Sequence, residues 1–499
     1  MTKANRFGFA FDNSYARDLE GFYVAQEGAF APAPQVVRLN EALARDLGLD
    51  PDALRSEAGA HVLAGSVLPE GASPLAMAYA GHQFGGFSPQ LGDGRALLLG
   101  EVKNAQGHRR DIHLKGSGRT PFSRGGDGKA VLGPVLREYL MGEAMAALGI
   151  PTTRALAATT TGAQVLREAG PQPGAVLARI GASHLRVGTF QFFAARGEAA
   201  RVSQLLDYCI ARHDPELADA PDKALLFLRN VIARQARLVA AWMGVGFIHG
   251  VMNTDNMTIS GETIDYGPCA FMDRYDPETV FSSIDQTGRY AYANQPGIAR
   301  WNLARLAETL LPFLSDDEAE AIRLATVEID GFIAVYEAAW TDVMRAKLGF
   351  RVPQAGDAAL ATAFLAAMQG QFGEGQGVDF TNAFRALSDV LRGDEGALAA
   401  QFTDRSVAQA WQAEWRARLD AEGGEDADRA AAMEAKNPTY IPRNHLVETA
   451  LAAAGTGDLG PFDALMEVLT APFTRRTGLE AFSQPAPDSF AGYRTFCGT

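Results

Sequence analysis

Apolar and polar residues alternate at short range between residues 76 and 180. Ile112 and Leu114 fall on one face of an extended segment, while His113 and Lys115 fall on the other, which is the period of a β-strand. Glycine-rich turns separate such runs. The pattern predicts strands at 95–102, 111–115, 153–159, 164–167 and 175–180.

Helical spacing dominates the rest of the chain. A helix over 130–148 is embedded in the β-rich region, because Gly149 and Pro151 supply stop signals. Residues 223–243 carry apolar positions at the spacing of a buried helix. Further helices are predicted at 39–49, 301–314, 317–347 and 358–368, and in segments up to about residue 469. The stretch 249–296 is predicted to be loop-rich.

These patterns divide the chain into four expected parts. The first is an irregular N-terminal segment with one helix, at 1–75, which should pack on the core. The core consists of a β-rich lobe at 76–180 and a helical lobe at 181–310. A helical extension follows at 311–499.

The composition narrows the class of protein. The chain has 499 residues, with 45 Lys and Arg against 59 Asp and Glu, so its formal net charge is −14. A nucleic-acid-binding protein needs a basic surface, and this chain is acidic. We therefore do not expect it to bind nucleic acid. No apolar run approaches the roughly 18 residues of a membrane span, and no secretory signal pattern precedes the first helix. With three cysteines, a disulfide framework is excluded, and a reducing cytoplasm is expected.

One segment carries recognisable chemistry. Asn256 follows His249 by seven residues, and Asp265 begins an Asp-Tyr-Gly sequence. In the catalytic loop of protein kinases, an Asn at that spacing and the Asp of a later Asp-Phe-Gly hold the metal ions. Amide and carboxylate oxygens suit Mg²⁺, which also binds nucleotide phosphates. The segment therefore predicts a metal site formed by Asn256 and Asp265, although an isolated His-Gly pattern would be an ordinary surface turn.

The departure from the kinase pattern is informative. Val251 stands where a kinase has the Asp that accepts the proton of the substrate hydroxyl, and a valine accepts nothing. Asp255 supplies a carboxylate four residues later, either as a base or as a neighbour of the metal.

A phosphate-binding lysine and its glutamate partner are also expected. Lys115 ends a predicted strand, and the helix that follows offers Glu138 and Glu143. Helical periodicity mildly favours Glu143, because it lies within the apolar stripe and Glu138 does not.

Several further groups suit phosphate binding, each with a simpler alternative. Gly92, Gly94 and Arg95 suit a phosphate cradle or a plain β-turn. Arg179 and Arg186 suit phosphate ligands or surface ion pairs. Residues 123–129 superficially match a Walker A loop but lack its first Gly and its final Ser or Thr. His82 has no partner at metal-ligand spacing and is expected to be a structural hydrogen-bonding group.

The motifs together closely resemble the selenoprotein O family of kinase-fold protein adenylyltransferases, over nearly the whole chain. The matching segments are Asn13-Ser14-Tyr15-Ala16, Ala80-Gly81-His82-Gln83-Phe84-Gly85, Gln90-Leu91-Gly92-Asp93-Gly94-Arg95-Ala96, Leu114-Lys115-Gly116-Ser117-Gly118, residues 249–257, Asp265-Tyr266-Gly267-Pro268-Cys269 and Asn437-Pro438-Thr439-Tyr440-Ile441-Pro442-Arg443-Asn444. The resemblance implies an α+β, protein-kinase-like two-lobed fold, with the nucleotide in the 76–180 lobe and the metal loop in the 181–310 lobe.

The resemblance also implies an activity and its residues. ATP would bind in a flipped orientation, with Mg²⁺ or Mn²⁺, and AMP would pass to Ser, Thr or Tyr hydroxyls of proteins. Asp255 would be the proton acceptor, Glu138 the partner of Lys115, and Asn256 and Asp265 the metal ligands. The implied ATP-binding residues are Gly92, Gly94, Arg95, Lys115, Asp127, Gly128, Arg179, Arg186 and Asp265.

Two other functions stay open: phosphorylation of a small molecule or protein, and a catalytically inactive nucleotide-binding scaffold. The expected partners are protein substrates, with no nucleic acid and no membrane, and the protein is expected to be a monomer. The family often carries a cysteine or selenocysteine near its C-terminus, and Cys497 has that position. We hypothesise that Cys497 pairs with Cys269 under oxidation, the alternative being two unrelated thiols.

Overall fold

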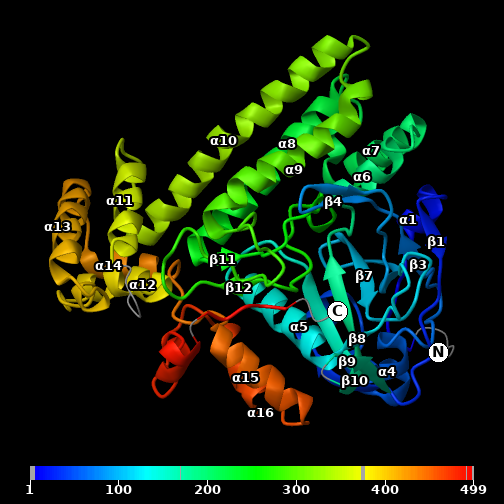
Figure 1. The fold of residues 1–499 in the computed structure, drawn as a ribbon, viewed down its shortest axis with the longest axis horizontal. Helices are drawn as coiled ribbons and strands as arrows, with labels where there is room; N and C mark the ends of the chain where they lie inside the picture. Colours follow the sequence, from blue (N-terminus) through cyan, green and yellow to red (C-terminus); the bar gives the residue numbers. More distant parts are fainter. Residues whose placement is uncertain (1–5, 169, 372–376, 491, 497–499) are drawn as a thin grey trace.

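The computed structural model describes residues 6–168, 170–371, 377–490 and 492–496. It has a mixed α/β architecture, in which a twisted antiparallel sheet occupies one end of the molecule and helices form the rest (Figure 1). The long helices α8 (Lys223–Val245), α9 (Gln295–Leu310) and α10 (Glu318–Leu348) lie side by side away from the sheet (Figure 1). The β-rich part and the helical part therefore correspond to the two hydrophobic patterns in the sequence, alternation and helical spacing.

The sheet has eight strands in the described part of the chain, in the order β1-β3-β6-β7-β10-β9-β2, with β8 paired to β10. Each of its pairings is antiparallel. Two short hairpin-like pairs, β4–β5 and β11–β12, lie outside it. The bounds are β1 Tyr23–Ala25, β2 Gln35–Leu39, β3 Leu75–Met77, β4 Gly81–Gln83, β5 Gly86–Ser88, β6 Ala96–Lys103, β7 Arg109–Lys115, β8 Ala130–Val131, β9 Arg154–Arg167, β10 Gly170–Gly181, β11 Phe247–Ile248 and β12 Ala270–Phe271.

The predicted strands at 95–102, 111–115 and 175–180 are confirmed as β6, β7 and β10. The predicted break between 153–159 and 164–167 is wrong, since β9 runs through both. Its partner β10 is long enough to pair along this length, and a register shift between Pro173 and Ala175 absorbs the irregularity.

The helices predicted at 130–148, 223–243, 317–347 and 358–368 are confirmed within a few residues, whereas the one predicted at 301–314 begins earlier, at Gln295. No helix in the described ranges is both long and apolar enough to span a bilayer. The remaining bounds are α1 Ser14–Asp18, α2 Glu41–Asp46, α3 Pro51–Arg55, α4 Glu57–Leu63, α5 Leu132–Ala147, α6 Val187–Ala194, α7 Ala199–His213, α11 Asp357–Gln369, α12 Phe380–Leu391, α13 Arg405–Glu422, α14 Asp426–Glu434, α15 Asn444–Gly455 and α16 Gly460–Leu469.

The N-terminal segment is more ordered than the sequence predicts. Instead of one helix at 39–49, it has the strand β2, which ends at Leu39, followed by the short helix α2. The Asn40 side chain accepts a hydrogen bond from Leu43 N and so starts α2. Gly48, with φ of 73°, follows its end. Strands β1 and β2 form the two edges of the sheet.

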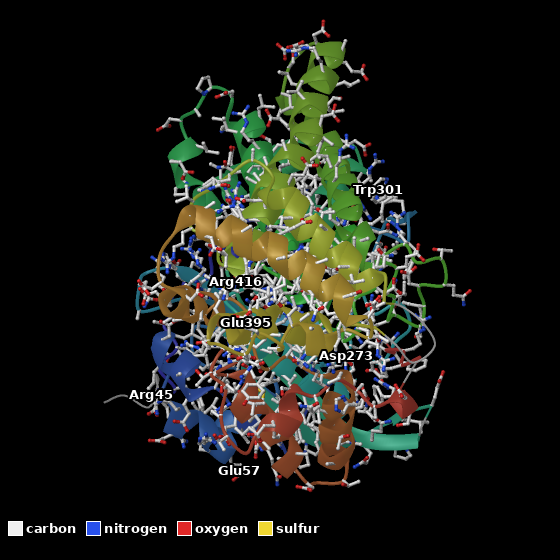
Figure 2. All side chains as sticks on the ribbon, turned by 90° about the vertical axis from the view of Figure 1, so that its left-hand side faces the viewer. Arg45, Glu57, Asp273, Trp301, Glu395 and Arg416 are labelled. Atoms are coloured by element: carbon white, nitrogen blue, oxygen red, sulfur yellow. The ribbon has the colours of Figure 1, made fainter. Side chains whose placement is uncertain are left out.

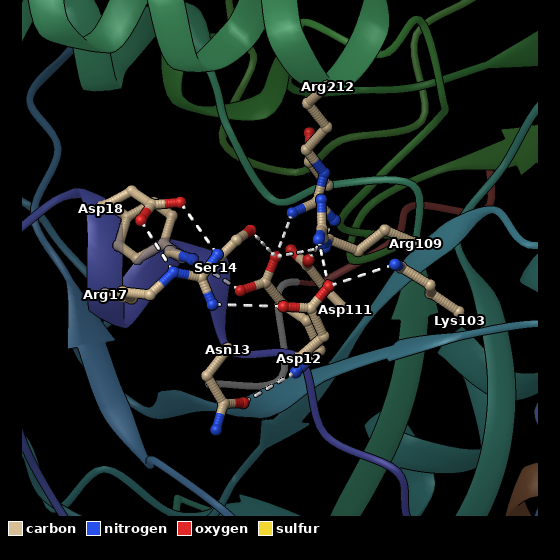
Figure 3. A network of polar contacts seen from close by, with 12 residues as sticks. Asp12, Asn13, Ser14, Arg17, Asp18, Lys103, Arg109, Asp111 and Arg212 are labelled. Atoms are coloured by element: carbon tan, nitrogen blue, oxygen red, sulfur yellow. Dashed lines mark hydrogen bonds and ion pairs between the residues drawn. The ribbon is translucent and has the colours of Figure 1, made fainter.

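A buried ionic network joins this segment to the sheet and to α7 (Figure 3). Glu101 of β6 is fully buried and accepts hydrogen bonds from Ser14 Oγ at 2.8 Å and from Tyr15 N at 2.6 Å. Arg212 of α7 pairs with both Glu101 and Asp111. Buried charges are stable only when paired, so these contacts fix the position of the N-terminal segment.

A second buried network joins the helical extension to the segment that follows Gly267. Arg443 is fully buried; it pairs with Asp273 and donates to Asp379 Oδ2 at 2.6 Å. The neighbouring Asn444 donates to Phe271 O at 3.0 Å. Residues 271–273 are thus held by the motif Asn437 to Asn444.

Replacing Arg443 should destabilise the folded protein. We expect Arg443→Met to lower the free energy of unfolding by about 3–5 kcal/mol, because it leaves Asp379 buried without its counter-charge. Arg475→Met is the control: its pair with Asp389 is partly exposed and should contribute about 0–1 kcal/mol. Urea denaturation followed by circular dichroism measures both. Equal losses would contradict the role of Arg443.

Lys347, at the end of α10, is a buried amine. It is 3% exposed, and its Nζ lies 4.2 Å from the centroid of the Phe384 ring. Burial lowers the pKa of Lys347 to about 7. A lysine in an unfolded chain has a pKa of about 10.4. Between these values the unfolded state binds more protons, so stability rises with pH from about 7 to 10.

We therefore expect Lys347→Met to raise the free energy of unfolding at pH 7 by a few kcal/mol. The gain should shrink as the pH rises toward about 10.4, the pKa of the lysine in the unfolded chain, because the unfolded state then loses its proton as well. The cation–π contact with Phe384 offsets part of the burial cost, which limits the gain. Urea titrations at pH 7 and pH 10 measure it, with exposed Lys436→Met as the control. A pH-independent difference would show that the amine is not a buried charge.

Candidate active site

One cleft collects the predicted site residues. It has a volume of about 510 Å³ and lies between the sheet and the loop after β11. All eleven residues expected to bind ATP, hold metal or accept the proton line it: Gly92, Gly94, Arg95, Lys115, Asp127, Gly128, Arg179, Arg186, Asp255, Asn256 and Asp265. Residues more than 170 positions apart in the sequence thus meet at one place.

The cleft is basic in an acidic protein. Four carboxylates line it, namely Asp93, Asp127, Asp255 and Asp265. The chain as a whole has a formal net charge of −14, so the excess of cations is local. Such a cleft attracts a polyanion of small size. Its seven cationic residues are Arg95, Lys115, Arg124, Lys129, Arg167, Arg179 and Arg186.

Asp265 is the centre of this charge arrangement. Its Oδ1 lies 2.7 Å from both Lys115 Nζ and Arg179 Nη1, and its Oδ2 lies 2.9 Å from Arg186 Nη1. Burial alone would raise the pKa of Asp265, but these three cations hold it well below its usual range. The carboxylate is therefore charged, and three cationic side chains surround it.

The partner of Lys115 is Glu138. Lys115 Nζ lies 2.6 Å from Glu138 Oε2, and Arg179 Nη1 lies 3.0 Å from Glu138 Oε1. The periodicity that favoured Glu143 is misleading, because Glu143 pairs instead with Arg154 of β9 at 2.6 Å. Both glutamates are buried on α5. Periodicity identifies the buried face of a helix but not which residue along it meets the end of β7.

These two glutamates make a matched pair of variants. We expect Glu138→Gln to lower the catalytic rate by about tenfold to a hundredfold, because it loosens Lys115 and Arg179 at the centre of the cleft. Glu143→Gln should lower thermal stability but leave the rate per folded molecule nearly unchanged. Steady-state kinetics and thermal unfolding of both variants measure the difference. A rate loss confined to Glu143→Gln would reverse the assignment.

Asp255 has the environment of a proton acceptor. Its Oδ2 accepts a hydrogen bond from Gln83 Nε2 at 3.1 Å, while its Oδ1 is buried without a hydrogen-bond partner in the described residues. Burial raises the pKa of Asp255 to about 6. A carboxylate with a pKa near neutrality is better suited to accept a proton than an ordinary aspartate.

The oxygen donors suit Mg²⁺. Asn256 donates from Nδ2 to Val251 O at 3.0 Å, which leaves its amide oxygen for another partner. The described residues contain no cluster of three His, Cys, Asp or Glu side chains that could hold a metal alone. Mg²⁺ commonly takes one or two protein oxygens and fills its other positions with water and substrate phosphates. Asn256 and Asp265 therefore fit Mg²⁺ bound together with a nucleotide.

The loop that carries Gly92 is tightly packed. Gly92 has φ of 68°, and a Cβ there would lie 2.3 Å from Phe122 Cγ, so this position requires glycine. Asp93 Oδ2 accepts a hydrogen bond from Met77 N at 3.0 Å and lies 3.1 Å from His113 Nε2. Arg95, in contrast, makes no ion pair within the residues that the structure describes. The loop thus holds a cation at the cleft without neutralising it.

Sequence reasoning missed several residues at the site. These residues are Gln83, Phe84 and Tyr79. Gln83 donates a hydrogen bond to Asp255, and Phe84 lines the cleft. The centroid of the Tyr79 ring lies 4.6 Å from the Arg186 guanidinium. Gln83 and Phe84 belong to a motif that supported the family resemblance, but no spacing rule gave them a role. His82 is a structural hydrogen-bonding group as expected, since its Nδ1 lies 2.8 Å from Gln191 Nε2.

Cys269 is buried and has no disulfide partner among the described residues, and burial raises the pKa of its thiol to about 12. Cys497 lies outside the described residues. Pairing of the two cysteines stays a prediction.

The chain is similar to known proteins over nearly its whole length. The family model described as Protein adenylyltransferase SelO matches residues 6–470. A protein nucleotidyltransferase YdiU of Cereibacter sphaeroides is 61% identical over 492 residues, covering 98% of this chain and 100% of the relative. Proteins of the same name from Methylorubrum populi and Rhodopseudomonas palustris are 55% and 56% identical, each covering 98% of this chain and 99% of the relative.

The cleft and these matches define an enzyme of the nucleotidyltransferase class. The chain belongs to the SelO family of protein adenylyltransferases.

Proposed function

We propose that the protein transfers AMP from Mg²⁺-bound ATP to Ser, Thr or Tyr hydroxyls of other proteins, in the basic cleft of a kinase-like two-lobed fold. The observation that carries the proposal is the convergence of Asp255, Asn256 and Asp265 with seven cations in one cleft. A triphosphate needs several cations, and family membership supplies adenylyl transfer as the reaction.

Each part of the cleft has a role in this proposal. Lys115, Arg179 and Arg186 contact Asp265 in the structure and would bind the phosphates when ATP enters. Gly92, Gly94 and Arg95, with Asp127 and Gly128, form the other wall of the cleft. Asn256 and Asp265 would hold Mg²⁺, which when bound neutralises phosphate charge and favours displacement at phosphorus.

The chemical step is a single displacement. The oxygen of the acceptor hydroxyl forms a bond to the α-phosphorus, while the bond from this phosphorus to the oxygen bridging to the β-phosphate breaks. Pyrophosphate leaves, and the hydroxyl proton passes to the Asp255 carboxylate. Gln83 orients this carboxylate through its hydrogen bond to Oδ2.

Phosphoryl transfer is the alternative reaction. A kinase uses an Asp at the position that Val251 occupies here, and the Val251 side chain is 8% exposed and offers no acceptor. Incubation of the protein and an acceptor protein with ATP labelled separately on the α- and γ-phosphates distinguishes the two. We expect label from the α position. Label from the γ position alone would contradict the proposal, and ATP binding without any transfer would indicate a scaffold.

The remaining assignments are part of the same proposal. We propose the four-part division at 75, 180 and 310, a monomer, and a cytoplasmic location. Mn²⁺ would be able to replace Mg²⁺ at the oxygen ligands. The pairing of Cys269 with Cys497 is tested by peptide mapping without reduction after mild oxidation, where two free thiols would end the idea.

A further inference from the structure

The turn between β4 and β5 is built in an unusual way. Gln83 pairs with Gly86, so Phe84 and Gly85 alone form the turn, with φ of 51° and 87°. Two-residue turns with positive φ at both positions favour Asn-Gly, because a bulky side chain is strained there. Phe84 is 38% exposed, and the covered part of its ring packs edge-on against Tyr290, with ring centroids 5.2 Å apart. A bulky aromatic residue kept at a strained and partly exposed turn position suggests a role in binding.

This turn is fixed to the catalytic loop. His82 N donates to Thr254 Oγ1 at 2.7 Å, and Phe84 N donates to Asn253 Oδ1 at 3.1 Å. Gln83 contacts the Asp255 carboxylate. The hairpin is therefore fixed to the proposed proton acceptor, and its turn lies close to Asp255 in the structure.

The turn continues into an exposed apolar rim. Ile284 is 53% exposed and lines the cleft together with Phe84. Exposed large apolar side chains at the mouth of a cleft are typical of a binding surface. Phe87 of β5 is 42% exposed, but it pairs with His82 on the face of the hairpin opposite Gln83, away from the cleft. The Phe87 ring packs on His82, which in turn packs on Trp301 of α9, at the edge of the helical part (Figure 2).

A cation completes the rim. The Arg289 guanidinium lies 4.9 Å from the centroid of the Trp301 ring and close to Gly85. It pairs with no carboxylate in the described part of the chain. An occupant of this rim should therefore combine an apolar side chain with a carboxylate.

We propose that Phe84, Ile284 and Arg289 bind the acceptor polypeptide, and that they select a segment with an apolar residue and an acidic residue next to the acceptor hydroxyl. The inference rests on the proposed function, since the acceptor of a protein adenylyltransferase is a polypeptide that must reach Asp255. Burial of the apolar residue against Phe84 and Ile284 supplies affinity, and Arg289 fixes the direction of the chain.

Phe84→Asn is the decisive variant, because asparagine tolerates the left-handed backbone that phenylalanine resists. The variant relieves the backbone strain but loses the contact with the Tyr290 ring, so its melting temperature is measured beside its activity. The probes are two short synthetic peptides with one serine each, flanked by Leu and Asp in the first and by Ala and Asn in the second. AMP transfer is measured with ATP labelled on the α-phosphate.

We expect the wild type to prefer the Leu/Asp peptide by about tenfold to a hundredfold in kcat/KM, the value of one buried apolar side chain. Phe84→Asn and Ile284→Thr should each lose most of this preference but bind ATP normally. Arg289→Gln should remove only the part of the preference that comes from Asp, which a third peptide flanked by Leu and Asn measures. Phe30→Asn is the matched control, since Phe30 is an exposed phenylalanine that lines none of the cavities described above.

The other outcomes contradict the proposal in separate ways. Equal rates on both peptides, or a preference that survives in Phe84→Asn, would overturn the acceptor surface while leaving AMP transfer intact. Weaker ATP binding in Phe84→Asn would show that the ring stacks on the nucleotide instead. If the wild type transfers AMP to neither peptide nor any protein, the proposed function itself fails.

Discussion

Asp265→Asn should abolish nucleotidyl transfer while the protein stays folded, with a loss of at least about 10³-fold, or about 4 kcal/mol in the activation barrier. Asparagine keeps the size of the side chain and tolerates the φ of 61° at this position. It removes the charge that Lys115, Arg179 and Arg186 surround and the carboxylate proposed to hold Mg²⁺. Rapid measurement of AMP transfer at saturating ATP and Mg²⁺ tests this.

The Asp265→Asn variant should also be less stable than the wild type, and ATP should restore part of that stability. Without the carboxylate, three cations lie together without a counter-charge, so the melting temperature should fall. Addition of ATP should restore much of it, because the triphosphate replaces the lost charge and binds only the folded state. Asp330→Asn, which removes an exposed carboxylate on α10, is the control and should change neither property. Full activity in Asp265→Asn would remove the metal assignment.

Asp255→Asn should lower the rate of AMP transfer by about 10²–10⁴-fold, the usual contribution of a general base. The amide cannot accept the hydroxyl proton, but it can still receive the hydrogen bond from Gln83 through its oxygen. ATP binding should therefore be unchanged, so the loss should appear in kcat and not in the KM for ATP.

The two aspartate variants separate catalysis from metal binding. Mg²⁺-dependent binding of ATP should persist in Asp255→Asn and weaken in Asp265→Asn, as measured by calorimetry with and without Mg²⁺. Loss of Mg²⁺-dependent binding in Asp255→Asn would show that this carboxylate holds the metal and is not the base.

Local pattern was enough to predict much of the secondary structure. The alternation around Ile112 and Leu114 predicted β7, and the apolar spacing of 223–243 predicted α8, because each depends on one period within one segment. The short elements before residue 75 escaped the pattern, since β1 and β2 are fixed by pairing with distant strands.

Only some residues of the candidate site could be predicted from the sequence. The seven-residue spacing between His249 and Asn256 pointed to the loop that we propose to hold Mg²⁺, because the kinase catalytic loop has an Asn at that spacing. Gln83 and Phe84 carried no such signal, since their role comes from contact with a loop some 170 residues later.

The sequence by itself determined the chemical groups of the site: the carboxylates, the amide and the cations, which the motifs identify through residue type and spacing. Only the tertiary structure decided which groups meet. It paired Lys115 with Glu138 and placed Glu143 against Arg154, because helical periodicity sets the face of α5 but packing sets its position along β7 and β9. It also buried Asp255 and raised its pKa to about 6, an effect of desolvation that no local sequence pattern contains.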